Sequence, residues 1–428
     1  MRDEHLMKEI DKDIVIIGGG PAGLAAAIKA HQMGIKELLI IERESNLGGI
    51  LNQCIHNGFG IHYFNQELTG PEYAQKFIDQ INSLKIEYKV NTMAIQINAN
   101  KSLVCINSNE GIFKINTKSI ILAMGCREKT RFQICIPGTR PAGVYTAGLL
   151  QRLVNINGYL PGKNVVIIGS GDIGLIMARR LTFEGLKVKA VIEIKPYLGG
   201  LMKNKIQCLD DFDIPIYLSH TITEIYGKKK VEYIRFAKLD KNNKPIASTE
   251  KKIFCDTLVF SVGLIPENEL SRKNRIIIDE LTKGPVVDNY HQTSVPGIFA
   301  TGNVLHVYDL VDDVTKSSII TGENAVRYIN NELPTNDQIL KITAGKGINH
   351  VVPQNLLVKD KDNECKLSFR TADLYKDVNL CLSEKKKILL SKHFKILRPS
   401  EMAYIKLNND FFTEIDSSQE VVLSIVRR

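Results

Sequence analysis

Two glycine-rich turns, each placed between a strand-like run and a helix-like run, constrain the fold more than any other feature. Residues 13–17 (DIVII) are apolar and β-branched, and the segment that follows them, GGGPAGLAAAIKAHQMG, has the spacing of an amphipathic helix. Residues 164–168 (NVVII), followed by GSGDIGLIMARRLTFEG, repeat the same order. Both turns carry glycine at the first, third and sixth positions. The sequence therefore predicts two separate strand–turn–helix units of an α/β fold.

The first turn has the spacing of a dinucleotide-binding site. Gly18 would make the tight turn, Gly20 would let the backbone approach a pyrophosphate, and Gly23 would let helix and strand pack closely. The unpaired N–H groups at the start of the helix attract phosphates. The next strand, residues 37–41, ends at Glu42, where a carboxylate can accept hydrogen bonds from ribose hydroxyls. The residues expected at this site are Gly18, Gly20, Pro21, Ala22, Gly23, Glu42 and Arg43.

The second turn repeats this design. The strand after it, residues 187–192, ends at Glu193, again in the ribose position. An acid there would repel a 2′-phosphate, which favours NAD(H) over NADP(H). Lys195 and Arg179 leave NADP(H) open, because a basic group within reach can accommodate the extra phosphate. The residues expected at this site are Gly169, Gly171, Asp172, Ile173, Gly174 and Glu193.

Length and composition favour a soluble enzyme of several domains. At 428 residues the chain is long enough for more than one core, and its 44% apolar and 24% charged residues are typical of globular proteins. No run approaches the ~20 apolar residues of a membrane-spanning helix. Residues 1–13 lack the pattern of a signal peptide, so we expect a cytoplasmic location.

Charge and cysteine usage argue against two other classes of protein. The formal net charge is +9, but lysine and arginine are scattered among acids, which disfavours nucleic-acid binding. The eight cysteines include no CxxC pair and lie far apart in the sequence. Neither a metal site nor a disulfide framework is therefore predicted.

Further glycine motifs follow each turn in a fixed order. They are residues 47–49 (LGG), 119–125 (SIILAMG), 256–263 (DTLVFSVG) and 297–303 (GIFATGN). This order resembles the pyridine nucleotide-dependent flavoproteins with two dinucleotide-binding domains, the superfamily of the disulfide reductases. The resemblance runs over roughly residues 10–335.

The resemblance implies an α/β fold with two Rossmann-like dinucleotide-binding domains, in which the NAD(H) domain is inserted into a split FAD domain. The expected boundaries are 1–155 and 285–335 for the two parts of the FAD domain and 156–284 for the NAD(H) domain. Residues 336–428 remain for a small C-terminal β domain. The implied cofactors are FAD and NAD(H).

The same resemblance assigns the glycines to cofactors. The implied FAD contacts are Gly18, Gly20, Gly23, Glu42, Gly49, Gly125 and Gly302, with Arg127 near the adenine side. The implied NAD(H) contacts are Gly171, Gly174, Glu193 and Gly263. One position departs from the family pattern, since the usual Gly-Asp pair is here Gly302-Asn303. Asparagine keeps a carbonyl acceptor for a ribityl hydroxyl, so we expect flavin binding to survive.

The thiol pair of a disulfide reductase is missing. Such chemistry needs two thiols against the flavin, yet the segment after Gly49, ILNQCIHNG, holds only Cys54 where a CxxxxC pair would lie. Cys54 and His56 are either wall residues of the flavin pocket, which we favour, or a redox site. No catalytic side chain is assigned.

A polar segment follows the Gly-Asn turn, and two interpretations of it stay open. Its candidate residues are His306, Asp309, Asp312 and Asp313. Acids at a helix start are favoured for capping alone. The other interpretation gives them a direct part in flavin tuning or in substrate protonation.

A narrower resemblance rests on six stretches. They are residues 48–64 (GGILNQCIHNGFGIHYF), 67–74 (ELTGPEYA), 124–131 (MGCREKTR), 136–148 (IPGTRPAGVYTAG), 207–215 (QCLDDFDIP) and 302–313 (GNVLHVYDLVDD). These resemble the NAD(P)/FAD oxidoreductases associated with glycerol-3-phosphate dehydrogenases in anaerobic bacteria, which are related to flavin subunits of amino-acid and cyanide-forming dehydrogenases. The resemblance implies a protein redox partner. An iron–sulfur centre would have to come from another chain, because the C-terminal region holds only Cys365 and Cys381.

After residues 331–336 the glycine motifs stop and β-like runs appear. The predicted strands are residues 355–358, 366–370, 378–382, 388–390 and 404–407, and the charged run 384–387 is predicted to be a solvated turn. We expect a small antiparallel β domain that covers the flavin domain or docks a partner.

Three functions are compatible with these features. The favoured one is hydride transfer between NAD(H) and bound FAD with electron exchange to a partner protein, such as a glycerol-3-phosphate or amino-acid dehydrogenase subunit. Stacked nicotinamide and isoalloxazine rings need no side-chain acid or base for that transfer. The alternatives are a stand-alone NADH oxidase or thiol/disulfide reductase that uses Cys54, and a non-catalytic redox-sensing or structural subunit. The oligomeric state is left open.

Overall fold

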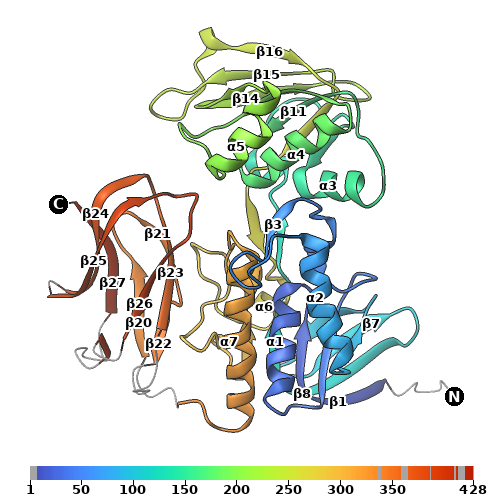
Figure 1. Ribbon diagram of the computed structural model, residues 1–428, viewed down its shortest axis with the longest axis vertical. Helices are drawn as coiled ribbons and strands as arrows, with labels where there is room; N and C mark the ends of the chain where they lie inside the picture. Colours follow the sequence, from blue (N-terminus) through green and yellow to red (C-terminus); the bar gives the residue numbers. More distant parts are fainter. Residues whose placement is uncertain are drawn as a thin grey trace. The chain divides into compact units, whose positions relative to one another are not determined.

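The chain forms two compact units. The computed structural model describes residues 7–334, 339–357, 365–385, 387–408, 411–412 and 420–427 (Figure 1). The first unit combines Met1–Cys126 with Pro266–Arg428, and the second is Arg127–Ile265. A two-stranded sheet of β9 (Cys126–Glu128) and β18 (Leu264–Pro266) contains both points where the chain passes between the units. The second unit is therefore an insertion in the sequence of the first, which confirms the predicted interrupted order.

The first unit is built on a sheet with strand order β5-β2-β1-β8-β7-β6, and β19 pairs with β8. The bounds are β1 (Lys8–Ile17), β2 (Leu38–Ile41), β5 (Glu87–Lys89), β6 (Met93–Ile97), β7 (Leu103–Asn107), β8 (Gly111–Leu122) and β19 (Ile298–Ala300). Strands β5, β2, β1, β8 and β19 are parallel, and β7 and β6 continue the sheet antiparallel. Strand β19 follows the insertion in the sequence, so the sheet contains segments that precede the second unit and one that follows it.

Helices cover one face of this sheet, and connecting segments cover the other. The helices are α1 (Pro21–Gln32), α2 (Gly70–Ser83) and α7 (Val311–Ile329). Ile14 and Ile16 of β1 pack into the helix-side core, whereas Val15 and Ile17 face the opposite core. Helices α1 and α7 approach closely at Gly322, where a Cβ would lie 2.4 Å from the backbone oxygen of Ala26.

Shorter elements connect these layers. They are η1 (Gly49–Gln53), β3 (Asn57–Phe59), β4 (Leu68–Thr69), η2 (Arg131–Ile134), α6 (Glu269–Lys273) and η5 (Gly302–Val304). Helix α2 begins in a capping box, in which Glu72 N–H donates to Thr69 Oγ1 and Thr69 N–H donates to Glu72 Oε2.

The second unit contains a parallel sheet with strand order β10-β17-β11-β12-β13. The bounds are β10 (Val144–Thr146), β11 (Asn164–Ile168), β12 (Lys187–Ile192), β13 (Ile216–Tyr217) and β17 (Thr257–Phe260). Helices α3 (Ala147–Asn155), α4 (Asp172–Phe183) and α5 (Met202–Cys208) share a core with one face, and η3 (Asp210–Phe212) follows them. An antiparallel sheet of β14 (His220–Tyr226), β15 (Tyr233–Lys238) and β16 (Lys251–Phe254), with η4 (Ala247–Thr249), packs on the other face.

The C-terminal region is mainly β, as predicted, and its described strands form two sheets. Their orders are β22-β20-β27-β24-β25 and β21-β23-β26. The bounds are β20 (Ile339–Ala344), β21 (Ile348–Val352), β22 (Asn355–Leu357), β23 (Cys365–Thr371), β24 (Tyr375–Glu384), β25 (Lys387–Leu397), β26 (Ala403–Leu407) and β27 (Glu420–Arg427). Val352 packs in the same apolar core as Val287 and Leu305, so this region shares a core with the rest of the first unit.

The C-terminal prediction was incomplete in two respects. The five predicted runs correspond to β22 to β26, and the prediction omitted β20, β21 and β27; Val358 and Lys386 lie outside the described residues, as do residues 335 and 336 of the predicted connection. The larger sheet is also not purely antiparallel. Strand β27 returns beside β20 and pairs with it in parallel.

The compact units do not follow the residue boundaries expected from the sequence. Strand β10 and helix α3 precede residue 156, yet β10 pairs with β17 and α3 packs in the core of the second unit. The segment from Pro266 to residue 284 belongs to the first unit. Within the described part of the chain, no helix is long and apolar enough to cross a membrane.

Candidate nucleotide-binding sites

The first glycine turn lies where parallel strands end side by side. Ile17 at the end of β1 is level with Ile41 of β2 and Leu122 of β8, and Ala300 of β19 is level with Leu122. The carboxyl edge of a parallel sheet is where α/β proteins bind ligands. The predicted residues that this edge brings together are Gly18, Gly20, Pro21, Ala22, Gly23, Glu42, Gly125, Gly302 and Asn303.

Two glycines of this turn are required by the protein itself. Gly18 has a φ of 113°, and a Cβ there would lie 2.3 Å from the backbone oxygen of Ala123. A Cβ on Gly23 would lie 1.8 Å from the backbone oxygen of Gly18. A side chain at Gly18 would therefore push away the residue after β8, and one at Gly23 would push α1 away from the turn.

Gly20 and Gly49 instead leave space beside the start of α1. A Cβ on Gly20 would have Gly49 Cα as its nearest neighbour, at 3.9 Å, and a Cβ on Gly49 would lie 3.0 Å from Gly20 Cα. Any side chain on either residue would fill the gap between the turn and the η1 segment. An open, glycine-lined helix start fits a pyrophosphate, because backbone N–H groups can approach it directly.

Glu42 is held by backbone N–H groups. Its side chain is buried, its Oε2 accepts the N–H of Gly19 at 2.7 Å, and its Oε1 accepts the N–H of Glu44 at 2.8 Å. Each carboxylate oxygen keeps a further lone pair for a ribose hydroxyl. Arg43 is exposed and its Nε lies 4.0 Å from Glu44 Oε1.

Asn303 connects the Gly-Asn turn to neighbouring segments. Its Oδ1 accepts the N–H of Tyr308 at 3.1 Å, and its Nδ2 donates to Cys126 Sγ at 3.7 Å. A Cβ on Gly302 would lie 2.7 Å from Ala22 Cβ, so this turn touches the start of α1. The side-chain oxygen of Asn303 was expected to bind a ribityl hydroxyl. In the structure it already accepts a hydrogen bond from the backbone of the following loop.

The second turn has the same construction in the second unit. Gly169 has a φ of 90°, and a Cβ there would lie 2.1 Å from the backbone oxygen of Ser261. Glu193 Oε2 accepts the N–H of Ser170 at 2.8 Å and its Oγ–H at 2.7 Å, while Oε1 accepts the N–H of Lys195 at 2.8 Å. The predicted residues at this carboxyl edge are Gly169, Gly171, Asp172, Ile173, Gly174, Glu193 and Gly263.

Sequence reasoning missed a second Leu-Gly-Gly, residues 198–200, which repeats residues 47–49 at the same spacing from the ribose-position glutamate. Gly199 N–H donates to Ser170 Oγ at 2.8 Å, and a Cβ on Gly200 would lie 2.6 Å from Asp172 Oδ1. Asp172 in turn accepts the N–H of Leu201 at 2.8 Å. The loop is thus hydrogen-bonded to the turn before α4 and to its first residue. The repeat of the Leu-Gly-Gly sequence could have predicted this loop.

Cys54 is not poised as a nucleophile. Its Sγ–H donates to the backbone oxygen of Ile50 at 3.3 Å, and burial raises its pKa to about 12. The thiolate is the reactive form of cysteine, and the raised pKa keeps this thiol in its protonated form at neutral pH. His56 Nδ1 lies 3.1 Å from the backbone oxygen of Asn57.

The polar residues after the Gly-Asn turn do not form one group. Asp309 and Asp313 contact the C-terminal region through Arg370 and Tyr404. Asp312 Oδ2 accepts the N–H of His62 at 3.3 Å, at the first turn of α7. The His306 ring packs at a tilt against the Tyr308 ring, and neither of its buried nitrogens has a hydrogen-bond partner among the described residues. Burial, with the charge of Arg370 nearby, lowers the pKa of His306 well below its usual value.

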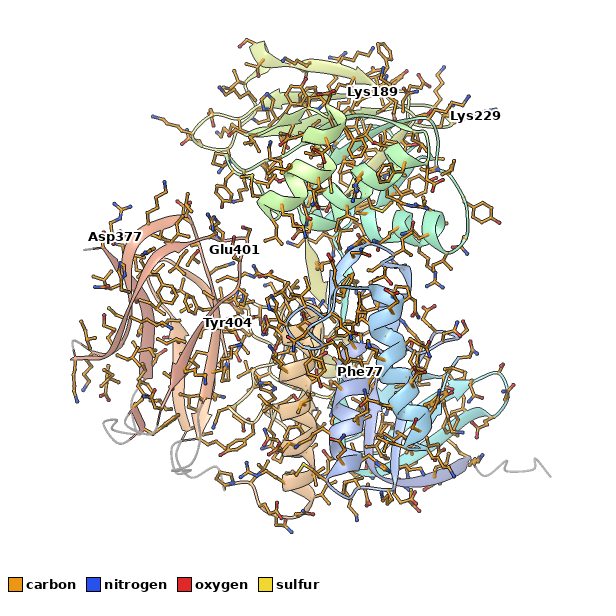
Figure 2. The ribbon with its side chains drawn as sticks, in the orientation of Figure 1. Phe77, Lys189, Lys229, Asp377, Glu401 and Tyr404 are labelled. Carbon is orange, nitrogen blue, oxygen red and sulfur yellow. The ribbon has the colours of Figure 1, made fainter. Side chains whose placement is uncertain are left out.

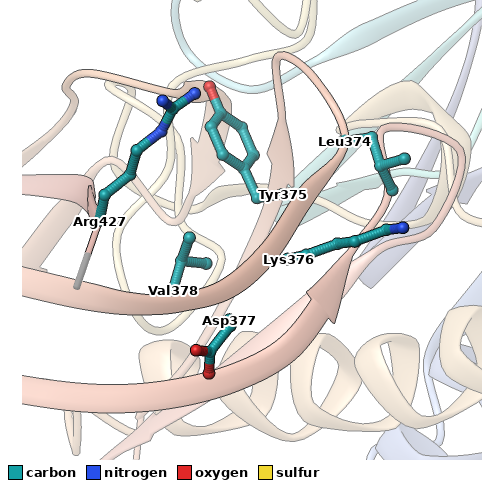
Figure 3. A pocket seen from close by; sticks show the side chains of 6 residues that line it. All are labelled: Leu374, Tyr375, Lys376, Asp377, Val378 and Arg427. Atoms are coloured by element: carbon teal, nitrogen blue, oxygen red, sulfur yellow. The ribbon is translucent and has the colours of Figure 1, made fainter.

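A surface hollow lies away from both glycine turns, in the C-terminal region. It has a volume of about 310 Å³ and is lined by Leu374, Tyr375, Lys376, Asp377, Val378 and Arg427 (Figure 3). These residues belong to β24, β27 and the turn before β24, and no glycine turn contributes. Among the described residues, no group of three or more His, Cys, Asp and Glu side chains could hold a metal ion.

A family model supports the assignment of both turns to one class of enzyme. The model for pyridine nucleotide-disulphide oxidoreductases matches residues 12–326, which include both glycine turns and the Gly-Asn turn. The chain belongs to this family. It is accordingly an oxidoreductase that uses FAD and a pyridine nucleotide. The match ends before the C-terminal β region.

Curated relatives in this family have several names. Hydrogen cyanide synthase subunit HcnB of Pseudomonas protegens is 30% identical over 60% of this chain and 58% of its own length. An opine oxidase subunit of Agrobacterium tumefaciens is 21% identical over 68% and 61%, and thioredoxin reductase of Ureaplasma parvum is 27% identical over 68% and 88%. The chain thus spans about three fifths of the length of the cyanide synthase and opine oxidase relatives.

Solved structures agree on the fold. Thioredoxin reductase of Lactococcus lactis superposes with a TM-score of 0.61 and 22% identity, over 75% of this chain and 99% of that one. The thioredoxin reductase of T. acidophilum gives 0.60 and 23%, over 74% and 98%. At this identity the likeness supports the two-domain α/β fold alone.

Proposed function

We propose that this chain transfers a hydride between NAD(H) and bound FAD and exchanges the electrons with a partner protein. The observation that carries the proposal is the pair of equivalent glycine turns, each held by a buried glutamate, in a chain whose segment after Gly49 has one thiol with a raised pKa in place of a thiol pair. The first unit would hold FAD and the second the pyridine nucleotide. FAD, when bound, supplies the hydride acceptor, and the chain supplies binding and orientation.

We propose the following residues at the two sites. For FAD they are Gly18, Gly20, Pro21, Ala22, Gly23, Glu42, Arg43, Gly49, Gly125, Arg127, Gly302 and Asn303. For the pyridine nucleotide they are Gly169, Gly171, Asp172, Ile173, Gly174, Glu193 and Gly263.

NAD(H) is favoured over NADP(H) by the way Glu193 is fixed. Both of its carboxylate oxygens accept backbone N–H groups, from Ser170 and Lys195, so the charge cannot swing away from a 2′-phosphate. Arg179, one of the two bases that kept NADP(H) open, lies over the ring of Phe183 at 5.0 Å.

A protein partner is supported by the nature of the relatives and by the missing thiol pair. Two of the relatives are named as subunits of a hydrogen cyanide synthase and an opine oxidase. A flavin that is not reoxidised through a dithiol needs another acceptor or donor. We propose a dehydrogenase subunit in this role, with glycerol-3-phosphate and amino-acid dehydrogenases as the first candidates.

Anaerobic mixing of the FAD-loaded chain with NADH tests the proposal. The flavin absorbance near about 450 nm should bleach fully. Gly171→Val should retain FAD but bleach slowly, because the side chain would fill the pyrophosphate space. Gly158→Asn is the matched control in the same unit, since Gly158 has a φ of 68° that asparagine adopts and no neighbour within 4 Å of a Cβ. Unchanged absorbance of the wild type with both NADH and NADPH would reject the proposal.

A thiol or disulfide reductase is the second candidate, because a thioredoxin reductase and a subunit of an alkyl hydroperoxide reductase, the latter from Pseudomonas putida, are among the relatives. It would require Cys54 as the reacting thiol. Steady NADH consumption with a small aromatic disulfide, abolished by Cys54→Ser, would establish this activity in place of electron exchange with a partner. A non-catalytic subunit would instead bind both nucleotides, with no NADH consumption by the complex assembled with its partner.

A further inference from the structure

The C-terminal β region contacts the rest of the first unit at residues 287–289 and along residues 303–313, and the second of these segments includes part of the Gly-Asn turn. This segment runs from Asn303 of the Gly-Asn turn to the first turn of helix α7. The hydrogen bonds to residues 303–313 come from the sheet β21-β23-β26 and from the connection before β26. Figure 2 shows Tyr404 of β26 on the side of the region that faces α7. The family match does not extend to this region, so its role must be argued from the contacts.

Arg370 makes the central contact. Its side chain, on β23, is 13% exposed. The guanidinium donates to the backbone oxygen of Val307 at 3.2 Å and forms an ion pair with the carboxylate of Asp309. A third bond, to the backbone oxygen of Pro399 at 3.4 Å, holds the guanidinium on its own domain. Charge-assisted bonds of this kind are stronger than neutral ones and fix geometry.

Two further contacts support the same segment. Asp309 Oδ2 also accepts the N–H of Met402 at 2.6 Å. Tyr404 Oη–H donates to Asp313 Oδ2 at 3.0 Å, at the first turn of α7. Lys366 lies 3.5 Å from the Tyr404 ring centre and 3.8 Å from Asp313 Oδ1. The connection between the turn and the helix is therefore held at Val307 and Asp309, and the start of the helix at Asp313, all by residues of the C-terminal region.

The bonds of Arg370 flank the residue that holds Asn303. Val307 and Asp309 lie on either side of Tyr308, whose N–H donates to Asn303 Oδ1 at 3.1 Å. Tyr308 Oη–H donates to Ser317 Oγ at 2.8 Å, which attaches the segment to α7. With the residues before and after it fixed, Tyr308 presents its N–H to Asn303 in one orientation.

We propose that Arg370 is a positioning residue of the flavin site, which acts through residues 307–309 on Asn303, and that the C-terminal β region is thereby part of the machinery that binds FAD. The inference rests on the proposed function in one respect, namely that Asn303 faces bound FAD. The ion pair itself is a property of the protein and can be tested without cofactor.

The test compares amide hydrogen exchange of the peptide that covers residues 303–316 in the full chain. Arg370→Gln removes the charge and the guanidinium group that bonds Val307 and Asp309. Exchange in this peptide should become about tenfold faster, the size expected for loss of a charged hydrogen bond. Arg427→Gln is the control, because Arg427 is an exposed arginine on the other sheet of the same region. Arg370→Lys should restore part of the protection. If Arg370→Gln does not fold, Tyr404→Phe removes only the hydroxyl at Asp313 and should still speed exchange.

FAD binding supplies the second measurement. In Arg370→Gln the bound flavin should dissociate about tenfold faster and its midpoint potential should shift, whereas Arg427→Gln should match the wild type in both. Equal exchange in Arg370→Gln and Arg427→Gln would overturn the proposal, as would altered exchange with unchanged flavin dissociation and potential. A wild type that takes up no FAD would instead reject the proposed function.

Discussion

Glu42 and Glu193 hold the two glycine turns by the same hydrogen bond. One oxygen of each carboxylate accepts the N–H of the residue after the first glycine, Gly19 at 2.7 Å and Ser170 at 2.8 Å. In each case the other carboxylate oxygen accepts the backbone N–H of the residue two positions after the glutamate, Glu44 or Lys195. The ribose-position acid therefore has a structural role in both units, in addition to any contact with a nucleotide.

The first prediction concerns the choice of pyridine nucleotide. Glu193→Gln keeps an acceptor for the Ser170 N–H but removes the charge that repels a 2′-phosphate. The ratio of kcat/KM for NADH to that for NADPH should fall about tenfold. Steady-state kinetics with both nucleotides measures the ratio, and Glu184→Gln, a partly exposed acid that follows α4, serves as the control. An unchanged ratio would show that Glu193 does not discriminate.

The second prediction separates the glycines that the fold needs from those that a ligand needs. Gly23→Ala places a Cβ 1.8 Å from the Gly18 oxygen and should lower the free energy of unfolding by about 3 kcal/mol. Gly171→Ala meets its nearest neighbour, Ser261 Oγ, at 3.5 Å and should fold normally while it binds NADH more weakly. Urea denaturation and NADH titration distinguish the two effects. Equal stability of the two variants would contradict the assignment.

The third prediction concerns acid stability. Burial, and then the charge of Arg370, lowers the pKa of His350 to about 4. Between its usual pKa of about 6.5 and this value, the unfolded chain binds a proton that the native state does not, so stability falls as pH falls. His350→Gln should remove up to about 3 kcal/mol of this loss between pH 6.5 and 4.

Urea midpoints at a series of pH values measure that slope. The urea midpoint of the variant should fall less steeply than that of the wild type from about pH 6.5 to pH 4. Above about pH 6.5 the two plots of midpoint against pH should run parallel. His62→Gln, with an exposed imidazole, is the control and should follow the wild type. A slope for His350→Gln as steep as that of the wild type would mean that His350 is protonated in the native state.

The fourth prediction concerns thiol reactivity. Cys54, with a pKa of about 12, should be alkylated by iodoacetamide at neutral pH at least about tenfold more slowly than the exposed Cys135. Mass spectrometry of time points gives both rates in one sample. If Cys54 were labelled as fast as Cys135, the result would support the thiol reductase as the function of the chain.

The features that the sequence predicted best are those set by local spacing. Each glycine turn and the glutamate that follows it lie within a few tens of residues, at Gly18 and Glu42 and at Gly169 and Glu193. The strand–turn–helix order is therefore evident from the sequence pattern alone. The second Leu-Gly-Gly, residues 198–200, was equally visible as a repeat. Its function as a loop tied to Asp172 became clear only from the hydrogen bonds.

The features that the sequence could not provide depend on contacts between distant segments. Nothing local in Arg370 or Asp309 indicates that they pair, because β23 reaches the segment after the Gly-Asn turn only through the packing of the C-terminal region. The same applies to Asn303, whose carbonyl was assigned to a ligand and is already bonded to Tyr308. Strand β27 was omitted although it is strongly apolar, since its pairing with β20 spans the whole region.

The place of β27 in its sheet has a consequence for how the chain is made. It lies between β20 and β24, so the two halves of that sheet have no hydrogen-bonded partner in common until residues up to Arg427 have left the ribosome. Strand β27 follows both glycine turns and their sheets in the sequence, so this larger C-terminal sheet is completed after them during synthesis. The nascent chain could therefore form both strand–turn–helix units before the larger C-terminal sheet is complete.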